Sequence, residues 1–118
     1  METQVNKWRL PTIQELKSIV DYTKYNPATS IKGIKPDFYW TSSTNASDSK
    51  YSWVVGFDDG SDFWNGKKAI YCVRCVRTLE DGSLEWAKED APNKMTWQEA
   101  MDYAESLNSE PKQTIVLE

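Results

Sequence analysis

The sequence predicts an α+β domain, and three features of the chain support this class. Two segments, towards the two ends of the chain, combine helix-capping residues with the apolar spacing of an amphipathic helix. Between them lie short runs that alternate apolar and polar residues, joined by turns in which Asn or Asp stands beside Gly. A length of 118 residues is enough for one domain with a hydrophobic core that needs neither metals nor disulfides.

The first helix is predicted over residues 13–22, directly after the segment Trp8-Arg9-Leu10-Pro11. Thr12 is the expected N-cap, and Glu15, three residues on, would complete a capping box. Arg9 is expected to be structural, tying its loop to a carboxylate or to carbonyl oxygens. The apolar face of this helix comprises Ile13, Leu16, Ile19 and Val20.

An antiparallel meander is predicted in the middle of the chain, after an extended loop over residues 24–37. Its second strand alternates regularly along the segment "YSWVVGF", which is typical of a strand with two distinct faces. Asp59-Gly60 is expected to form a two-residue hairpin turn. The strands are expected at residues 38–44, 51–57, 62–64 and 69–77.

The C-terminal part is predicted to contain a turn and a short strand over residues 79–86, followed by a charged loop and a helix. This helix is expected from Trp97 to about Leu107, with Thr96 as its N-cap and Glu99 closing a second capping box. Residues 114–118 favour either one more strand or a frayed end. The apolar stripe of the helix comprises Trp97, Ala100, Met101, Ala104 and Leu107.

Composition excludes several classes of function. The net charge is −4, the pI is about 4.9, and Lys and Arg never run beyond two in a row, which argues against a nucleic-acid partner. No apolar run reaches the length of a membrane span. The chain has no histidine and no phosphate-loop, dinucleotide or nucleophile-elbow motif, so we expect neither an enzyme nor a cofactor.

Two further motifs have a structural and a functional interpretation. Cys72 and Cys75 lie in a strand-like run, where positions i and i+3 face opposite ways, so we expect two small, partly buried side chains rather than a redox or metal pair. Asp58, Asp59 and Asp62 suggest a calcium loop, but the closing Glu of a twelve-residue loop is missing, so a hairpin turn is favoured and no metal site is predicted.

Four segments, in this order, carry a resemblance to a known family: "WRLPTIQELKSIVD", "YWTSS", "WVVGFDDG" and "YCVRCVR". They resemble the hallmarks of the Lcl C-terminal domain, a bacterial family named after the C-terminal domain of a collagen-like adhesin. The resemblance covers residues 8–77. It implies a C-type-lectin-like fold, in which two helices flank a small twisted antiparallel sheet with long loops. It also implies an exported or surface-attached protein, as most members of the family are. The characterised role of the adhesin domain is recognition of sulfated polysaccharide.

The chain departs from the family in the order of its segments. The family's strand-and-helix segment precedes "WRLP", whereas its likeness here, residues 82–108, follows the last strand. The family's helix often carries a cysteine that pairs with the last strand; here that position corresponds to Ala104, which leaves Cys75 without this partner. If residues 1–78 are the tail of one family copy and 79–118 the head of the next, the head completes the domain in cis, giving a monomer, or in a segment-swapped dimer.

The predicted function is a non-catalytic recognition or adhesion module of an extracellular, cell-surface or periplasmic bacterial protein, which binds a carbohydrate or a protein ligand. One alternative is a structural or protein-interaction repeat of a larger surface protein. Another is an oxidase similar to formylglycine-generating enzymes, which the cysteine spacing disfavours. The acidic net charge counts against a sulfated ligand, and only Lys67-Lys68 with Lys50 offers a local basic patch. The predicted ligand-binding residues are Asn45, Asp58, Asp62, Trp64, Asn65, Lys67 and Lys68.

Overall fold

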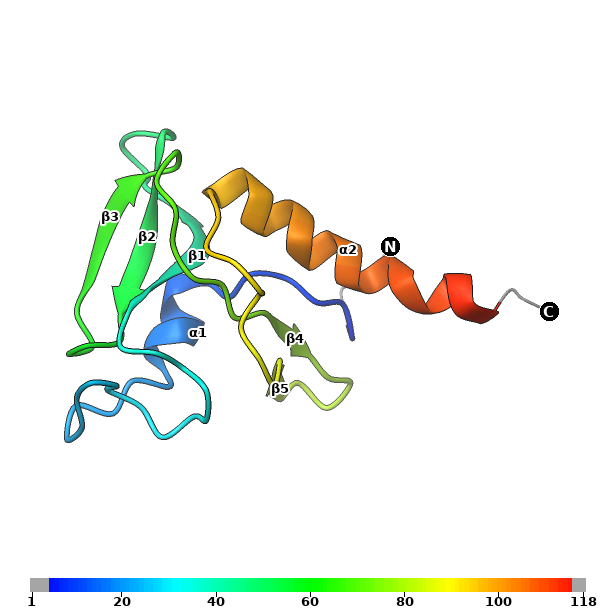
Figure 1. Cartoon of the computed structure of the whole chain (residues 1–118), viewed down its shortest axis with the longest axis horizontal. Coiled ribbons are helices and arrows are strands. Elements are labelled where there is room, and N and C mark those ends of the chain that lie inside the picture. Colours follow the sequence, from blue (N-terminus) through cyan, green and yellow to red (C-terminus); the bar gives the residue numbers. More distant parts are fainter. Residues whose placement is uncertain (1–4, 116–118) are drawn as a thin grey trace.

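The computed structural model of the protein describes residues 5–115, and side chains as far as Asn108. Within this range the chain combines helices with small antiparallel sheets, which confirms the predicted α+β class (Figure 1). The elements follow in the order α1 (Ile13–Lys17), β1 (Phe38–Thr44), β2 (Tyr51–Gly56), β3 (Asp62–Gly66), β4 (Val76–Thr78), β5 (Leu84–Trp86) and α2 (Trp97–Ile115).

Strands β1, β2 and β3 form an antiparallel sheet in that order, and β4 pairs with β5 in a separate hairpin. The prediction that residues 69–77 continue the meander is wrong. Instead of returning along β3, this segment crosses the other edge of the sheet, where Cys72 forms a parallel bridge with Tyr39 of β1. Other backbone groups of this segment bond to Met95, which bridges Tyr71, and to Arg9, which bridges Val76. The carbonyls of Val73 and Cys75 accept from the N–H groups of Ala91 and Ala87.

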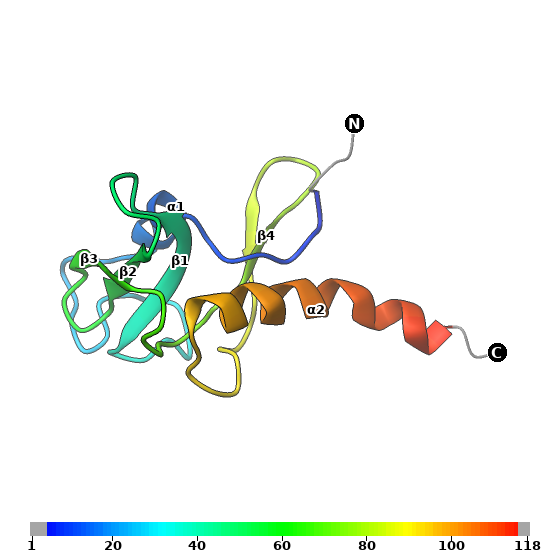
Figure 2. The same ribbon diagram turned by 90° about the horizontal axis from the view of Figure 1, so that it is seen from above.

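Two hydrophobic clusters pack against the three-stranded sheet, one on each face. Successive residues of a strand point to opposite faces, so Tyr39 and Trp40 of β1 enter different clusters, as do Val54 and Val55 of β2. Figure 2 shows α1 and α2 on opposite sides of β1. The cluster on the α2 side contains Leu10, Trp40, Val54, Val73, Cys75, Ala100 and Ala104. The cluster on the α1 side contains Leu16, Ile34, Tyr39, Val55, Phe57 and Cys72.

Helix α1 begins as predicted but ends earlier. The capping box is present, because the Glu15 N–H donates to Thr12 Oγ1 over 3.1 Å and the Thr12 N–H donates to Glu15 Oε1 over 2.9 Å. The predicted end at residue 22 is wrong, since the helix stops at Lys17. Beyond it, the Asp21 N–H donates to the Ala28 carbonyl over 2.7 Å, so this backbone bonds to the following loop instead of continuing the helix.

The connection between β2 and β3 is also longer than predicted. The prediction of a two-residue turn at Asp59-Gly60 is wrong, because β2 ends at Gly56 and β3 starts only at Asp62. Phe57 leaves the ladder and turns into the core, where its ring meets Tyr39 edge-on at 5.5 Å between centroids. Gly60, at φ +89°, supplies the left-handed residue that closes the wider turn.

Helix α2 begins at Trp97 as predicted, behind a second capping box. The Thr96 N–H donates to Glu99 Oε1 over 2.9 Å, and the Glu99 N–H donates to Thr96 Oγ1 over 3.3 Å. The helix runs past the expected end near Leu107 to Ile115, and it projects beyond the rest of the molecule (Figures 1 and 2). Residues 114–115 therefore belong to this helix, and residues 116–118 of the predicted C-terminal segment lie outside the described range.

Candidate functional site

The structure divides the predicted ligand-binding residues between two ends of the sheet. Pairing of β2 with β3 places Val55 opposite Asp62 at one end and Tyr51 opposite Gly66 at the other. Trp64 lies between them, opposite Trp53. Asp58 and Asp62 therefore belong to the end with the β2–β3 connection, whereas Asn45, Asn65, Lys67 and Lys68 belong to the end with the β1–β2 turn.

The acidic end is built as a turn. Asp58 Oδ1 accepts the Asp59 N–H over 2.9 Å, and Asp59 Oδ1 accepts the Ser61 N–H over the same distance. The hydrogen bond from Ser61 holds the pKa of the Asp59 carboxyl below its usual value. Asp62 pairs with Lys17 of α1 at 3.4 Å. The Asp58 and Asp59 carboxylates thus cap the turn, and Asp62 neutralises the charge of Lys17. Nowhere in the described part of the chain do three or more potential metal-ligating side chains meet.

The opposite end forms a basic hollow of about 430 Å³. The Lys67 ammonium lies 3.9 Å above the centroid of the Trp97 ring and donates to Thr44 Oγ1 over 3.1 Å, which fixes its position. Lys50 and Lys68 are exposed, and neither forms an ion pair within the described residues. The hollow is lined by Lys50, Tyr51, Gly66, Lys67 and Lys68.

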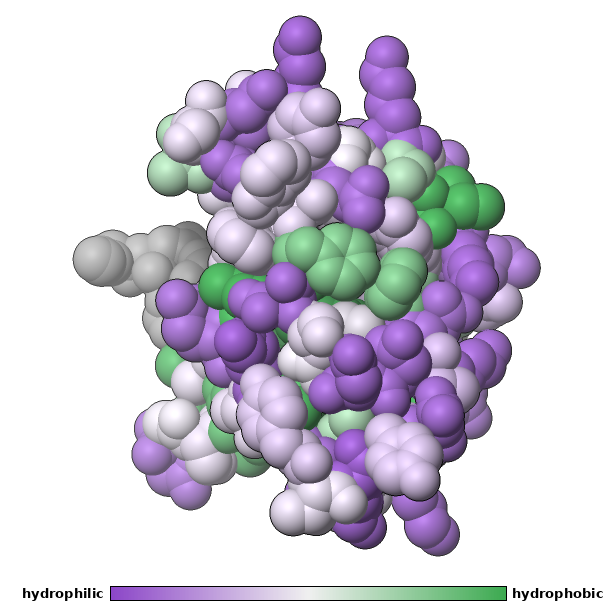
Figure 3. Space-filling model, turned by 90° about the vertical axis from the view of Figure 1, so that its left-hand side faces the viewer, coloured by the Kyte–Doolittle hydropathy of each residue, from purple (hydrophilic) through white to green (hydrophobic). Residues whose placement is uncertain are grey.

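A pair of aromatic rings, one exposed and one half-buried, borders this hollow. Trp64 is 49% exposed, and its ring meets Tyr51 edge-on with centroids 5.3 Å apart. Asn45 has a structural role, because its Oδ1 accepts the Ser47 N–H over 2.7 Å within the β1–β2 turn. Figure 3 shows the side of the molecule on which β3 lies; hydrophilic residues dominate it, and apolar residues form small patches.

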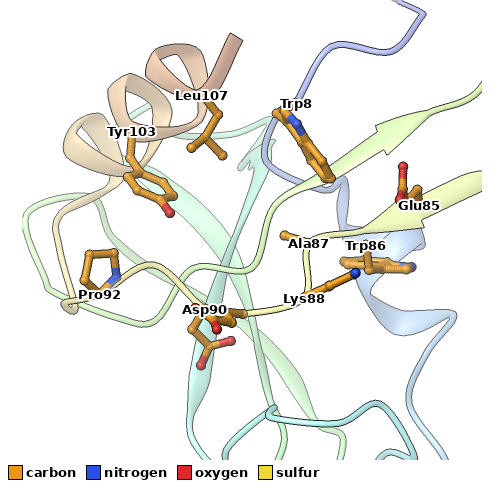
Figure 4. A pocket seen from close by; sticks show the side chains of 10 residues that line it. Trp8, Glu85, Trp86, Ala87, Lys88, Asp90, Pro92, Tyr103 and Leu107 are labelled. Carbon is orange, nitrogen blue, oxygen red and sulfur yellow. The ribbon is translucent and has the colours of Figure 1, made fainter. Parts of the chain in front are cut away.

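A larger groove, of about 540 Å³, lies between α2 and the segment after β5 (Figure 4). None of the predicted ligand-binding residues lines this groove. Trp8 enters the groove from the N-terminal part of the chain, and all its other lining residues follow β4. The groove is lined by Trp8, Glu85, Trp86, Ala87, Lys88, Glu89, Asp90, Pro92, Tyr103 and Leu107.

A buried ion pair holds one wall of this groove. The Arg74 guanidinium, with a side chain 1% exposed, donates from Nε to Asp90 Oδ1 over 2.8 Å and from Nη1 to the Ala87 carbonyl over 2.9 Å. Tyr39 donates its hydroxyl proton to Asp90 Oδ2 over 2.7 Å. Burial, together with Asp90, raises the pKa of the Tyr39 hydroxyl far above its usual value, which keeps it a donor. The sequence signal for this network is an arginine inside an apolar run, because a buried cation requires a partner.

The segment around Trp8 is held from both sides. Asn108 of α2 accepts the Trp8 N–H at Oδ1 over 2.7 Å, and its Nδ2 donates to the Trp8 carbonyl over 2.9 Å. The Arg77 guanidinium lies 4.8 Å from the centroid of the Trp8 ring. The structural role predicted for Arg9 is confirmed, because its Nη1 and Nη2 atoms bind both oxygens of Glu15 over 2.7 and 2.9 Å.

The two cysteines are buried, unpaired with each other, and separated by the sheet. Cys72 packs in the cluster on the α1 side and Cys75 in the cluster on the α2 side, which confirms the prediction that they face opposite ways. Burial raises the pKa of Cys72 to about 11 and that of Cys75 to about 12. Both side chains are more buried than predicted. Raised pKa values keep both thiols protonated at neutral pH, which lowers their reactivity.

Comparison with known proteins supports one assignment. The family model of the Lcl C-terminal domain matches residues 2–77, which is more than half of the chain. No curated protein and no solved structure matches the sequence. Among the helices that the structure describes, none combines the length and apolar character needed to cross a membrane. The chain belongs to the Lcl C-terminal domain family.

Proposed function

We propose that this protein is a non-catalytic recognition module that binds an anionic polysaccharide at the basic hollow. The observation that carries the proposal is the arrangement of Lys50, Lys67 and Lys68 around the hollow, beside the exposed Trp64 ring. An ammonium group binds sulfate or carboxylate as a compact point charge. An aromatic ring next to it offers an apolar face to the carbon-bound hydrogens of a sugar.

The charge of the whole chain limits how this binding would work. A net charge of −4 repels a polyanion at long range, so attraction comes from the local lysines alone. Lys67 is held by Trp97 and Thr44, so less side-chain freedom is lost when it binds than for an unrestrained lysine. We therefore propose modest, strongly salt-dependent affinity.

The family supports the biological setting of this proposal. A family named after the C-terminal domain of an adhesin suggests a surface-associated protein, and we propose an extracellular, cell-surface or periplasmic location. Two helices on opposite sides of a small antiparallel sheet are compatible with a C-type-lectin-like fold, which we propose for this chain. The burial of the Cys72 and Cys75 thiols in different clusters counts against the oxidase alternative, which needs a pair of cysteines that act together.

Surface plasmon resonance with immobilised heparin, and with unsulfated dextran as reference, tests the proposal. The Lys50→Gln/Lys68→Gln double variant should bind heparin at least about tenfold more weakly, because two ammonium–sulfate contacts are lost. The matched control, Lys7→Gln/Lys24→Gln, removes two exposed lysines with the same change of net charge. Raising the salt concentration should weaken binding of the unmodified protein. Absence of heparin binding at low salt, or an equal loss in both double variants, would refute the proposal.

A further inference from the structure

We infer that the groove between α2 and the segment after β5 is a second ligand site, which accepts an uncharged saccharide unit of one or two rings. This site is separate from the basic hollow and does not rest on the proposed function. All its lining residues except Trp8 lie after residue 77, outside the part of the chain that the family model matches.

The walls of the groove suit a ring with an apolar face. Figure 4 shows Tyr103 and Leu107 on the helix side and Trp8 and Ala87 across from them, with Pro92 below Tyr103. The volume of about 540 Å³ lies within the range of small-molecule pockets. Two hydrogen bonds to Asn108 hold the Trp8 backbone, and the Arg77 guanidinium lies 4.8 Å from the centroid of its ring, so one aromatic wall is already in place before a ligand binds.

Polar groups in the groove remain available to a ligand. The indole N–H groups of Trp40 and Trp97 donate to the carbonyls of Met95 and Thr41, within the core. Among the described residues, by contrast, no partner is found for the indole N–H groups of Trp8 and Trp86 or for the Tyr103 hydroxyl. A saccharide hydroxyl can accept from such donors while its ring packs on the aromatic walls.

The charges of the groove nearly cancel, which favours an uncharged ligand. Arg77 binds Glu85 Oε1 over 2.7 Å, and both oxygens of Asp90 are used by Arg74 and Tyr39. Among the lining residues this leaves Lys88 and Glu89, of opposite sign, without an ion pair in the described part of the chain. One free carboxylate and one free ammonium give the groove no net charge that would attract a cation or an anion, whereas hydroxyl groups can donate to Glu89 and accept from Lys88.

Titration of ¹⁵N-labelled protein with neutral disaccharides tests this inference. Maltose, cellobiose, lactose and N,N′-diacetylchitobiose are added separately at millimolar concentration, and the six tryptophan indole N–H signals are followed. At least one sugar should shift the signals of Trp8 and Trp86 and leave that of Trp64 unchanged. Choline serves as a cationic probe of the same aromatic walls.

Two substitutions remove single contacts without altering the core. Tyr103→Phe deletes the hydroxyl, and Glu89→Gln deletes an exposed charge; each should weaken sugar binding about 3–10-fold, as expected for one hydrogen bond. Tyr25→Phe and Glu105→Gln make the same chemical changes at exposed positions outside the groove and should leave affinity unchanged.

Four outcomes would overturn the inference. They are no shift of the Trp8 and Trp86 signals with any of the sugars, a shift of these signals by choline alone, a shift confined to Trp64, or equal affinity of Tyr103→Phe, Glu89→Gln and their controls. Binding of heparin at the basic hollow is measured separately through the lysine variants, so either proposal can fail while the other stands.

Discussion

Replacing Asp90 with leucine removes the carboxylate that pairs with the buried Arg74 guanidinium and accepts the Tyr39 hydroxyl proton. The side chains of Arg74 and Asp90 are 1% and 11% exposed, so water cannot take over the lost contacts. Breaking a buried pair by removing one partner costs about 3–5 kcal/mol. We expect a comparable loss from Arg74→Met, which leaves Asp90 without its cation.

The double variant Arg74→Met/Asp90→Leu should lose less stability than the sum of the two single variants. The second substitution removes the charge that the first has left unpaired, so the coupling energy should exceed about 1.5 kcal/mol. A loss of about 3–5 kcal/mol is a large part of the stability of an ordinary domain and should lower the melting temperature by roughly 10–20 °C. Urea unfolding followed by tryptophan fluorescence measures all four free energies.

The surface pair Arg77–Glu85 provides a matched control. Its side chains are 30% and 41% exposed, although the ion-pair distance of 2.7 Å is similar to that of the buried pair. The corresponding cycle, Arg77→Met with Glu85→Leu, should give a coupling of only about 0–1 kcal/mol. Additive effects in the buried cycle, or a coupling no larger than in the surface cycle, would refute the role assigned to burial.

Three further predictions concern the local contacts. Arg9 lowers the pKa of Glu15 below its unfolded value, so the Arg9–Glu15 ion pair stabilises the fold above a pH of about 4.5. This stabilisation is lost as the pH falls through the folded pKa of Glu15. In the Glu15→Gln variant, the unfolding free energy should therefore fall less steeply on the acid side. Asn108→Ala should lower the free energy of unfolding in urea by about 1–3 kcal/mol, because the Trp8 backbone loses both hydrogen bonds to Asn108. A smaller loss would contradict the stabilising role of these two bonds. Both cysteines should react with a thiol reagent at pH of about 8 far more slowly in the native state than in urea, and fast native labelling would contradict their burial.

The sequence predicts well those features that depend on neighbouring residues. Both capping boxes, at Thr12 with Glu15 and at Thr96 with Glu99, form as predicted because each joins residues three positions apart. The end of α1 at Lys17 could not be predicted in the same way. There the backbone of Asp21 bonds to a loop residue, and local spacing carries no information about that partner.

Long-range pairing explains the remaining errors. Residues 69–77 have the composition of a strand, but composition does not tell which edge of the sheet the segment will meet, and here it meets β1 rather than β3. The predicted site residues also alternate between two ends of the sheet, because successive turns of a meander lie at opposite ends. The groove escaped prediction since its lining combines Trp8 with residues more than seventy positions away along the chain.

The contacts of the C-terminal segment bear on the hypothesis that it is the head of a second family copy. Asn108 and Asp90 reach Trp8 and Arg74 through side chains, so these bonds do not depend on how the two segments are linked. The link itself is the β4–β5 turn, in which the Leu79 N–H donates to the Ser83 carbonyl over 2.8 Å. Because this link is short, the C-terminal segment stays at a high effective concentration beside the core of its own molecule. A swapped dimer, by contrast, would have to open the β4–β5 turn. We therefore expect light scattering to give a monomer mass at every concentration; a mass that rises to that of a dimer would show that the segment exchanges between molecules.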